Sequence, residues 1–303
     1  MTNLRIGTRG SPLALWQAHY VSDLLRTAVP GLAIELVQIQ TEGDEIRDVP
    51  LVQLGGEGIF TKAIQRAVLD RRVDLAVHSL KDLPTIVVAD LVLAAVPPRG
   101  PVGDVLVSHR HQRFADLPNG ATVATGSLRR RAQILSRRPD LNVIDIRGNV
   151  ETRLRKLAES DLDATILAQA GLERLGLSER ITEVLDPTWM LPAVGQGALG
   201  LECHVDDNDT RNLLSKIDHP STRHAVLAER AMLRGLGGGC QVPIASLSHT
   251  ENGQLFLQGV VLAPDGTGRI TQQIAGPPED AELLGQRLAN QLLDQGAREL
   301  LQT

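Results

Sequence analysis

Short apolar runs alternate with stretches of helical spacing through the first part of the chain. Apolar or alternating runs of a few residues are typical of strands, whereas apolar positions three and four residues apart are typical of amphipathic helices. These patterns predict strands at 4–8, 34–39, 73–77 and 91–96, and helices at 12–30 and 60–69. Ser11 is a natural N-cap for the first helix, and Pro12 suits its first position. Strands and helices that alternate in this way predict an α/β fold.

A proline-rich segment, residues 97–101 (PPRGP), separates this part from a second α/β part. The second part has expected strands at 122–125, 142–146 and 164–167, and expected helices at 128–138, at 150–160 and from Ala170-Gly171 onward. We call residues 97–101 the outward crossing, because the chain passes there from the first part to the second. A second crossing, the return crossing at residues 191–198 (LPAVGQGA), also contains glycine and proline and leads into an apolar strand at 199–203. Two such crossings indicate that the chain leaves its first domain and later returns to it.

The C-terminal part has a different order of elements. A helix from Pro220 to about Arg234 is followed by strands near 244–248, 255–262 and 269–275 and by a helix at 279–295. This order predicts a small α+β domain. We therefore expect two α/β lobes around a cleft, as in binding proteins, and a small C-terminal α+β domain. The expected boundaries are 1–97 with 198–217 for the first lobe, 102–192 for the second lobe and 220–303 for the C-terminal domain.

The composition is that of an ordinary globular protein, with 42% hydrophobic and 22% charged residues, and 303 residues suit two or three domains. No apolar run is long enough to span a membrane, and no signal-peptide core follows Met1. Two cysteines give no disulfide framework and fit a reducing cytoplasm. Since no Cys/His cluster has the spacing of metal ligands, we expect no structural zinc site and interpret Cys203-His204 as the end of a core strand.

The net charge of −5 argues against a general nucleic-acid-binding protein. Residues 127–156 nevertheless contain eight arginines and Lys156 but only three acidic residues, so their net charge is 9 − 3 = +6. A basic helix face is often only solvated, and arginine runs also bind nucleic acid, but nucleic-acid grooves use aromatic stacking and this chain is 2% aromatic. Because arginine forks grip carboxylates, arginines at several strand ends instead predict a small polyanionic ligand. The arginines placed for it are Arg129, Arg130, Arg147 and Arg153.

Two turns at the ends of expected strands carry further candidate side chains. Arg9 lies in the turn before the first helix, where the amides of a helix N-terminus favour an anion. Lys81 and Asp82 follow the strand 73–77, and ligands of open α/β sheets bind beyond the carboxyl ends of strands. This pair is either an ion pair on the surface or a carboxylate held beside a cation for proton transfer, and the sequence leaves both alternatives open.

The segment 237–243 (GGGCQVP) places Cys240 behind three glycines and before a proline. Glycine permits unusual backbone conformations and proline stiffens the exit, so we expect an exposed loop of defined shape. A thiolate on such a loop is a strong nucleophile with room for an attached group. Taken alone, the segment also fits a glycine-rich turn with an incidental buried cysteine, which behaves as a small hydrophobe.

Together these segments resemble the porphobilinogen deaminases, also called hydroxymethylbilane synthases. The matching segments extend over nearly the whole chain in the family's order: 8–14 (TRGSPLA), 78–84 (HSLKDLP), 127–130 (SLRR), 147–150 (RGNV), 191–197 (LPAVGQG) and 238–243 (GGCQVP). The resemblance implies three domains, the first two similar to type II periplasmic binding proteins. It implies an enzyme that joins four porphobilinogens head to tail, releases ammonia, and then frees a linear hydroxymethylbilane by hydrolysis. It further implies a cytoplasmic monomer of tetrapyrrole biosynthesis that uses no metal, membrane or nucleic acid.

The resemblance also implies roles for individual residues. Cys240 carries a dipyrromethane cofactor through a thioether, and Asp82 is catalytic because it stabilises positive pyrrole nitrogens and moves protons. The other residues that bind the cofactor are Lys81, Ser127, Arg129 and Arg130. The residues that bind the substrate are Arg9, Ser11, Phe60, Arg147, Arg153 and Arg174.

The chain departs from the common family pattern in two places. Residues 41–58 carry five acids and one arginine, a balance of 1 − 5 = −4, where many members have lysines. This balance puts in doubt a basic lid formed by that segment. Gly126 stands where a serine is common, which removes one hydroxyl donor.

A non-catalytic, two-lobed binding protein for a small polycarboxylate ligand is the main alternative. It accounts for the lobes and the arginines but gives no role to the Cys240 loop or to the C-terminal domain. A nucleic-acid-binding regulator with a ligand lobe is a weaker alternative, since no helix-turn-helix region is evident in the sequence.

Overall fold

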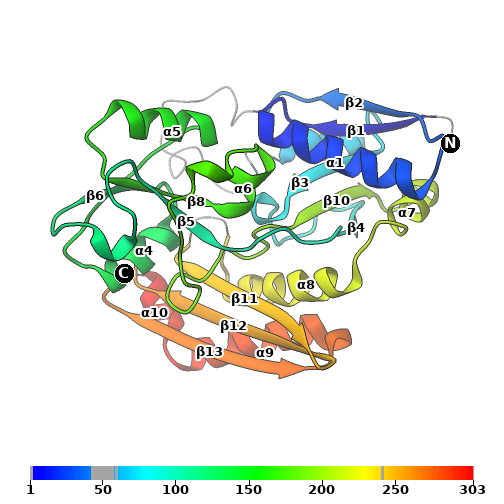
Figure 1. Ribbon diagram of the computed structural model, residues 1–303. Helices are drawn as coiled ribbons and strands as arrows, with labels where there is room; N and C mark the ends of the chain where they lie inside the picture. The colour runs from blue at the N-terminus through cyan, green and yellow to red at the C-terminus, as the bar shows by residue number, and fades with distance from the viewer. Residues whose placement is uncertain (1–2, 42–57, 59–60, 240–241, 303) are drawn as a thin grey trace. The chain divides into compact units, whose positions relative to one another are not determined.

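The computed structural model describes residues 3–41, 58, 61–239 and 242–302, which form three β-sheets and the helices that cover them (Figure 1). Contacts within the chain divide it into two compact units, Met1–Gly100 with Gly197–Arg223 and Pro101–Gln196 with His224–Thr303. The chain passes from one unit to the other within each of the two crossings that the sequence predicts, at Gly100/Pro101 and Gln196/Gly197, and again at Arg223/His224. No helix in the described ranges is both long enough and apolar enough to cross a membrane.

The first unit is built on a five-stranded sheet with the order β2-β1-β3-β10-β4. Its strands are β1 (Leu4–Thr8), β2 (Ile34–Gln38), β3 (Leu75–Ser79), β4 (Leu91–Ala95) and β10 (Leu199–His204). β1 pairs in parallel with β2 and β3, whereas β10 runs antiparallel between β3 and β4. The strand that follows the return crossing is therefore an inner strand of the first sheet.

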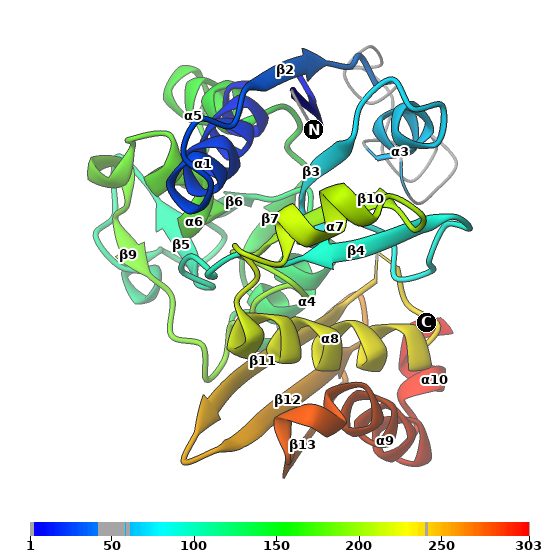
Figure 2. The ribbon, with the colours of Figure 1, turned by 90° about the vertical axis from the view of Figure 1, so that its right-hand side faces the viewer.

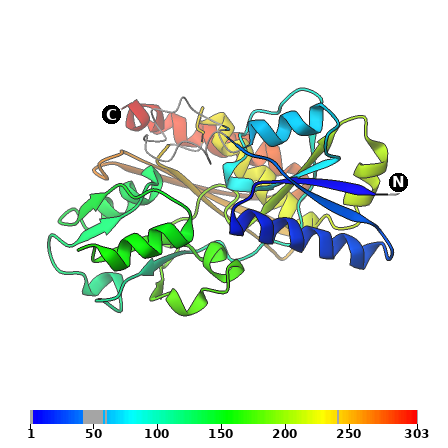
Figure 3. The ribbon, with the colours of Figure 1, turned by 90° about the horizontal axis from the view of Figure 1, so that it is seen from above.

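Helices cover both faces of this sheet. They are α1 (Pro12–Ala28), α3 (Lys62–Leu69) and α7 (Asn208–Leu214). Leu75 and Val77 of β3 pack with α1 and α7, whereas Ala76 packs with α3, because successive side chains of a strand point to opposite faces. Figure 3 shows α1 and α3, in dark and light blue, on opposite sides of the blue strands. α1 begins as predicted, with the Ser11 Oγ accepting the Ala14 amide at 3.4 Å.

The second unit contains a five-stranded sheet of the same design, with the order β7-β6-β8-β5-β9. Its strands are β5 (Asp104–Val107), β6 (Thr122–Ala124), β7 (Asn142–Ile144), β8 (Ala164–Ala168) and β9 (Glu183–Val184), and its helices are α4 (Leu128–Arg137), α5 (Val150–Glu159) and α6 (Gln169–Arg174). β6 is parallel to β7 and β8, whereas β5 is antiparallel to β8 and β9. In both sheets the fourth strand runs against the first three, which confirms the prediction of two α/β lobes.

The C-terminal part is an antiparallel sheet, β11-β12-β13, packed against helices. Its elements are α8 (Pro220–Gly235), β11 (Ile244–Glu251), β12 (Gln254–Leu262), β13 (Arg269–Gly276), α9 (Ala281–Asp294) and α10 (Ala297–Gln302). Figure 2 shows α9 alongside β12 and β13. α9 also approaches α8 closely, and Gly285 permits this because it has no side chain: a Cβ there would collide with the Ala228 carbonyl oxygen. This confirms the predicted small α+β part.

Some element predictions differ from the structure. The patterns do not predict β5, β9, α7 or α10. β3 lies at Leu75–Ser79 rather than 73–77, because Asp74 is engaged with Arg5 before the strand begins: its Oδ2 accepts the Arg5 amide at 2.7 Å. The strand therefore continues through His78 and Ser79, directly up to the turn that carries Asp82.

Candidate active site

The first candidate group lies at one edge of the first sheet, where β1 and β3 end. The two strands are parallel neighbours, so their carboxyl ends share this edge. Arg9 and Ser11 follow β1, and Lys81 and Asp82 follow β3 in a short 3-10 helix, η1 (Leu80–Asp82). All four side chains are partly exposed. The four predicted site residues of this unit that lie within the described ranges therefore follow two adjacent strands at the same end of the sheet.

The turn that carries Asp82 is fixed by its neighbours. Leu80 is 1% exposed and Leu83 is 4% exposed, and the Leu83 amide donates to the Leu80 carbonyl oxygen at 3.2 Å. The Leu80 amide donates to the Ala198 carbonyl oxygen, just before β10, at 3.0 Å. Gly200 leaves room for Leu80, since a Cβ at Gly200 would lie 2.7 Å from Leu80 Cδ1. The backbone of Asp82 is therefore held at the sheet edge by two leucines that are locked in the core.

Polar contacts beneath this edge are buried or partly buried. Gln17 of α1 donates its Nε2 to Ser79 Oγ at 2.7 Å, which joins α1 to the end of β3. His78 Nε2 lies 3.1 Å from Glu202 Oε2, and the same oxygen accepts Gln65 Nε2 at 2.9 Å. His78 and Glu202 are 4% and 5% exposed. His78, although it belongs to the HSLKDLP segment, thus supports β3 and β10 from within.

The second candidate group lies at the carboxyl ends of β7, β6 and β8, which are parallel neighbours in this order. Ser127 follows β6 and caps α4, with its Oγ accepting the Arg130 amide at 3.4 Å. Arg147 follows β7, and Asn149 caps α5 through a 2.9 Å hydrogen bond to the first turn. Arg174 ends α6, which follows β8. The predicted site residues of this unit therefore follow three adjacent strands.

Arg147 and Arg153 are held at the start of α5. Arg153 Nε donates to the Gly148 carbonyl oxygen at 2.8 Å, and Lys156 Nζ donates to the Arg147 carbonyl oxygen at 3.2 Å. Gly148 has a φ of 117°, and a Cβ there would lie 2.5 Å from Thr152 Cγ2. The RGNV segment therefore requires its glycine to turn into the helix. Both arginine side chains are partly exposed.

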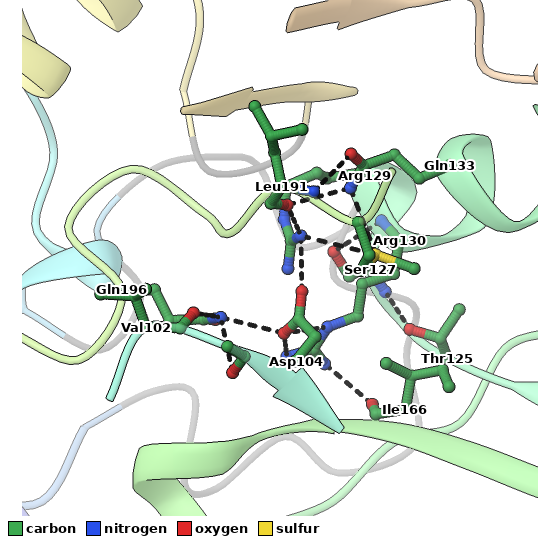
Figure 4. Close-up of polar contacts among 12 residues, drawn as sticks. Val102, Asp104, Thr125, Ser127, Arg129, Arg130, Gln133, Ile166, Leu191 and Gln196 are labelled. Atoms are coloured by element: carbon green, nitrogen blue, oxygen red, sulfur yellow. Dashed lines mark hydrogen bonds and ion pairs between the residues drawn. The ribbon is translucent and has the colours of Figure 1, made fainter. Parts of the chain in front are cut away.

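Arg129 and Arg130 differ from these residues because they are buried around Asp104 (Figure 4). Asp104, the first residue of β5, is 0% exposed, and the two arginines are 4% and 5% exposed. Asp104 Oδ2 accepts Arg129 Nη1 at 2.7 Å, and Asp104 Oδ1 accepts Arg130 Nε at 3.0 Å and Nη2 at 2.7 Å. Gln196 Nε2 donates to the same Oδ1 at 2.9 Å. Asp104 thus bridges two guanidinium groups and a residue of the return crossing.

Backbone carbonyls use further donors of the two arginines. Arg130 Nη1 donates to the Ile166 carbonyl oxygen at 2.9 Å, and Arg129 Nη1 to that of Leu191 at 2.5 Å. Arg129 Nε is buried and has no hydrogen-bond partner among the residues that the structure describes. Two guanidinium groups and one carboxylate carry a net charge of +1. An acidic group of a ligand would satisfy both the unused donor and the excess charge.

The charges of this group depend on one another. Burial by itself would raise the pKa of Asp104, but the charges and hydrogen bonds of Arg129 and Arg130 outweigh burial and hold that pKa well below its usual range. Burial lowers the pKa of Arg129, Asp104 opposes that shift, and the positive charge of Arg130 lowers the pKa further. Asp104 is therefore ionised at neutral pH and lies between two cations that repel each other.

Two predicted site residues, Phe60 and Cys240, lie outside the described residues, as does the acidic segment 42–57. The other cysteine, Cys203, is 0% exposed in β10, and burial raises the pKa of its thiol to about 11. This confirms that Cys203-His204 ends a core strand. Within the described ranges, no group of three or more His, Cys, Asp or Glu side chains is placed to hold a metal ion.

Sequence reasoning missed Asp104 and Gln196. It assigns Arg129 and Arg130 to a ligand and gives them no partner within the protein. A signal was present, because an aspartate opens the apolar run 104–107, and a carboxylate buried there requires a cation. The pattern of apolar residues does not identify this cation, because Asp104 pairs with arginines 25 or more positions away in the sequence.

Solved structures with a partial likeness to the chain include two binding proteins. A periplasmic substrate-binding protein of an ABC transporter from Coxiella burnetii has a TM-score of 0.44 at 14% identity, covering 73% of this chain and 94% of that chain. A methionine-bound nutrient binding protein from Burkholderia cenocepacia has a TM-score of 0.43 at 13% identity, covering 74% and 95%.

Sequence relatives are much closer. Residues 4–212 match the family described as "Porphobilinogen deaminase, dipyromethane cofactor binding domain", and residues 224–294 match "Porphobilinogen deaminase, C-terminal domain". The chain is 51% identical over 298 residues to the porphobilinogen deaminase of Geobacter metallireducens, covering 98% of this chain and 93% of the relative. It is 50% identical over 299 residues to that of Pelobacter propionicus, covering 99% and 96%. At this identity and coverage, the chain belongs to the porphobilinogen deaminase family.

Proposed function

We propose that this protein condenses four porphobilinogen molecules head to tail, releases one ammonia with each addition, and then frees a linear hydroxymethylbilane by hydrolysis. The observation that carries the proposal is the similarity to porphobilinogen deaminases over nearly the full length of both chains. In each addition, the bond between the aminomethyl carbon and its nitrogen breaks and ammonia leaves. That carbon bonds the free α-carbon of the preceding pyrrole, which then loses its proton.

The residues of the second unit fit a dipyrromethane cofactor. A dipyrromethane made from porphobilinogen carries acetate and propionate groups, so its recognition requires several cations. Arg129 Nε is a buried donor without a partner among the described residues, and its group with Arg130 and Asp104 has an excess positive charge. Ser127 adds a hydroxyl at the positive N-terminal end of α4. We therefore assign Ser127, Arg129 and Arg130 to the carboxylates of the cofactor.

When bound, the cofactor supplies the pyrrole α-carbon to which the first substrate is joined. Lys81 and Asp82 are the other residues that we assign to holding it. Lys81 is a compact positive charge suited to carboxylates, whereas Asp82 is suited to the pyrrole N–H groups.

Asp82 is also the residue that we assign to proton transfer. Positive charge develops on a pyrrole nitrogen as ammonia leaves and disappears when the α-carbon loses its proton. A positioned carboxylate stabilises that charge and accepts the proton. The anchoring of Leu80 and Leu83 supports this role, since it fixes the backbone on either side of Asp82 before substrate binds.

Partly exposed arginines are assigned to the acetate and propionate groups of the substrate and of the growing chain. Guanidinium groups stay charged across the neutral range, so they bind carboxylates without titrating. The proposed substrate-binding residues are Arg9, Ser11, Phe60, Arg147, Arg153 and Arg174.

Cys240 is the residue that we assign to covalent attachment of the cofactor. The chain has two cysteines, and the other, Cys203, is fully buried with a thiol pKa of about 11. At pH 7 such a thiol is ionised in only about one molecule in 10⁴, which makes it a poor nucleophile. At Cys240 the thiol sulfur bonds the aminomethyl carbon of a porphobilinogen as the bond from that carbon to nitrogen breaks; ammonia leaves, it takes up the thiol proton, and a thioether results.

We further propose that the enzyme acts as a monomer in the cytoplasm. A reducing compartment keeps the thiol of Cys240 available for attachment. Porphobilinogen, a small molecule, is the expected partner. The net charge of −5 disfavours nucleic acid as a partner.

Incubation of the purified protein with porphobilinogen tests the proposal. The expected result is consumption of porphobilinogen with four molecules of ammonia released for each hydroxymethylbilane formed. Binding of porphobilinogen without release of ammonia would contradict catalysis and favour the binding-protein alternative.

A further inference from the structure

We propose that Asp104 is a positioning residue: it clamps the guanidinium groups of Arg129 and Arg130 in one arrangement and ties that arrangement to the return crossing through Gln196. The inference rests on the proposed function, since it takes the two arginines to bind the acidic side chains of pyrroles. Asp104 itself touches no ligand and acts through the arginines.

The Asp104 carboxylate is fully used within the protein. Oδ2 accepts one hydrogen bond from Arg129, and Oδ1 accepts two from Arg130 and one from Gln196. A carboxylate has about four lone-pair positions, so these donors occupy its whole capacity. Asp104 is also 0% exposed. It therefore has no capacity left for a further ligand, and its contribution is to hold these donors.

The arginine pair needs such a clamp. Arg129 and Arg130 start the same helix, and the positive charge of Arg130 reaches Arg129 strongly enough to lower its pKa. Buried like charges repel, and long side chains without a shared anion would separate. Asp104 holds them together but leaves Arg129 Nε without a partner among the residues that the structure describes, and leaves the group with a net charge of +1. Asp104 thus fixes the positions of the two guanidinium groups without cancelling their combined positive charge.

Gln196 extends this clamp to both crossings. Its Nε2 also donates to the carbonyl oxygens of Val102 at 2.7 Å and Gly103 at 3.3 Å, the two residues that directly follow the outward crossing, residues 97–101. Gln196 is 1% exposed. Leu191, at the other end of the return crossing, accepts Arg129 Nη1 at its carbonyl oxygen. The arrangement of the arginines therefore depends on the return crossing at two points.

Asp104→Asn separates positioning from charge, because it keeps the size of the side chain and raises the net charge of the group from +1 to +2. If charge alone mattered, acidic pyrroles would bind more tightly. If Asp104 served only the fold, their binding to the folded variant would not change. A positioning role predicts weaker binding, since the repelling arginines lose their shared anchor.

The experiment uses full-length protein made in cells that produce no porphobilinogen, so that the chain begins without its cofactor. Porphobilinogen is then added at a series of concentrations, and covalent loading is followed by intact mass. For Asp104→Asn we expect the concentration for half-maximal loading rate to rise about tenfold, equivalent to about 1.4 kcal/mol, with the maximal rate within about threefold of the unaltered protein. A raised half-maximal concentration with a nearly unchanged maximal rate indicates lost positioning. A general loss of folded protein would instead lower the fraction of protein that becomes loaded and leave the half-maximal concentration unchanged.

Asp140→Asn is the matched control. Asp140 accepts Arg138 Nε and Nη2, each at 2.7 Å, in an exposed pair of the same unit. The same chemical change at this position should leave loading unaltered. If Asp104→Asn does not fold, Gln196→Met removes one donor to Asp104 and keeps both arginine contacts, and should raise the half-maximal concentration about threefold.

The proposal is overturned if the half-maximal concentration for Asp104→Asn is unchanged or lower than for the unaltered protein. If only Gln196→Met folds, an unchanged half-maximal concentration for Gln196→Met overturns it. An effect of Asp140→Asn as large as that of Asp104→Asn also overturns it. Failure of the unaltered protein to take up any pyrrole would instead overturn the proposed function on which the inference rests.

Discussion

Replacing Gly200 by alanine tests whether the turn that carries Asp82 depends on packing against β10. The added Cβ would lie 2.7 Å from Leu80 Cδ1 and 3.1 Å from Leu93 Cδ1. Carbon atoms pack best at about 3.5–4.0 Å, so Leu80 has to move by roughly 1 Å. Leu80 is 1% exposed and has little space to move into, and it opens the 3-10 turn that ends at Asp82.

Two magnitudes follow from this displacement. Overpacking of a core site costs about 1–3 kcal/mol, and 1 kcal/mol lowers the Tm of a domain of 150–250 residues by about 2–4 °C, so we expect the Tm to fall by about 2–12 °C. A shift of about 1 Å at a catalytic group costs up to about 10²-fold, so kcat for porphobilinogen should fall by about 10–100-fold.

Thermal melts and steady-state kinetics of Gly200→Ala measure both quantities. Leu80→Val removes the methyl group that the new Cβ meets, so Gly200→Ala/Leu80→Val should recover part of the lost kcat and show a coupling energy of at least about 0.5 kcal/mol. A Gly200→Ala variant with normal kcat and Tm would refute the reasoning. Additive effects of the two substitutions would refute it equally.

Three further predictions address single residues. Asp82→Asn should keep the Tm but lower kcat by about 10²–10⁴-fold, because the amide does not carry the proton; unchanged turnover would move this role to another residue. Arg153→Leu should stall loading or elongation in intact-mass spectra, whereas Arg155→Leu, an exposed neighbour on α5 paired with Glu159 at 3.1 Å, should not; equal effects would place Arg153 outside the binding site. Burial raises the pKa of Cys203 from 9.0 to about 11, so the folded chain holds that proton more tightly than the unfolded chain. The resulting stability, up to about 2–3 kcal/mol, is complete below pH 9 and disappears as the pH rises to 11. In thermal melts, the Tm of the unaltered protein minus that of Cys203→Ala should therefore fall between pH 9 and pH 11. A Tm difference that stays constant over this range would contradict the raised pKa of Cys203.

Local signals in the sequence predict much of the fold. Ser11 and Pro12 start α1 as expected, and β1 has the predicted bounds, because a cap or a short apolar run is decided by neighbouring residues. The order of strands and helices also predicts the two lobes and the C-terminal part, since that order is visible along the chain.

Features that depend on distant residues are not visible in this way. The antiparallel fourth strands, β5 and β10, are set by pairing across each sheet rather than by local pattern. Asp104 is similar, because its cations are 25 and 26 residues away. The sequence marks Gly126 only by its missing hydroxyl, but a Cβ there would lie 2.9 Å from both Asp145 Oδ1 and the Ile146 carbonyl oxygen. The segments that follow β6 and β7 approach each other closely here, which explains why a glycine stands at this position.

The most direct test of catalysis on a covalent primer is the intact mass of the purified protein before and after addition of porphobilinogen. We predict a mass above that of the sequence by two pyrrole units, and further increments of one pyrrole unit as substrate is added. The excess should persist in Cys203→Ala and disappear in Cys240→Ala. A mass equal to that of the sequence throughout, or an excess that survives in Cys240→Ala, would contradict the proposed enzyme.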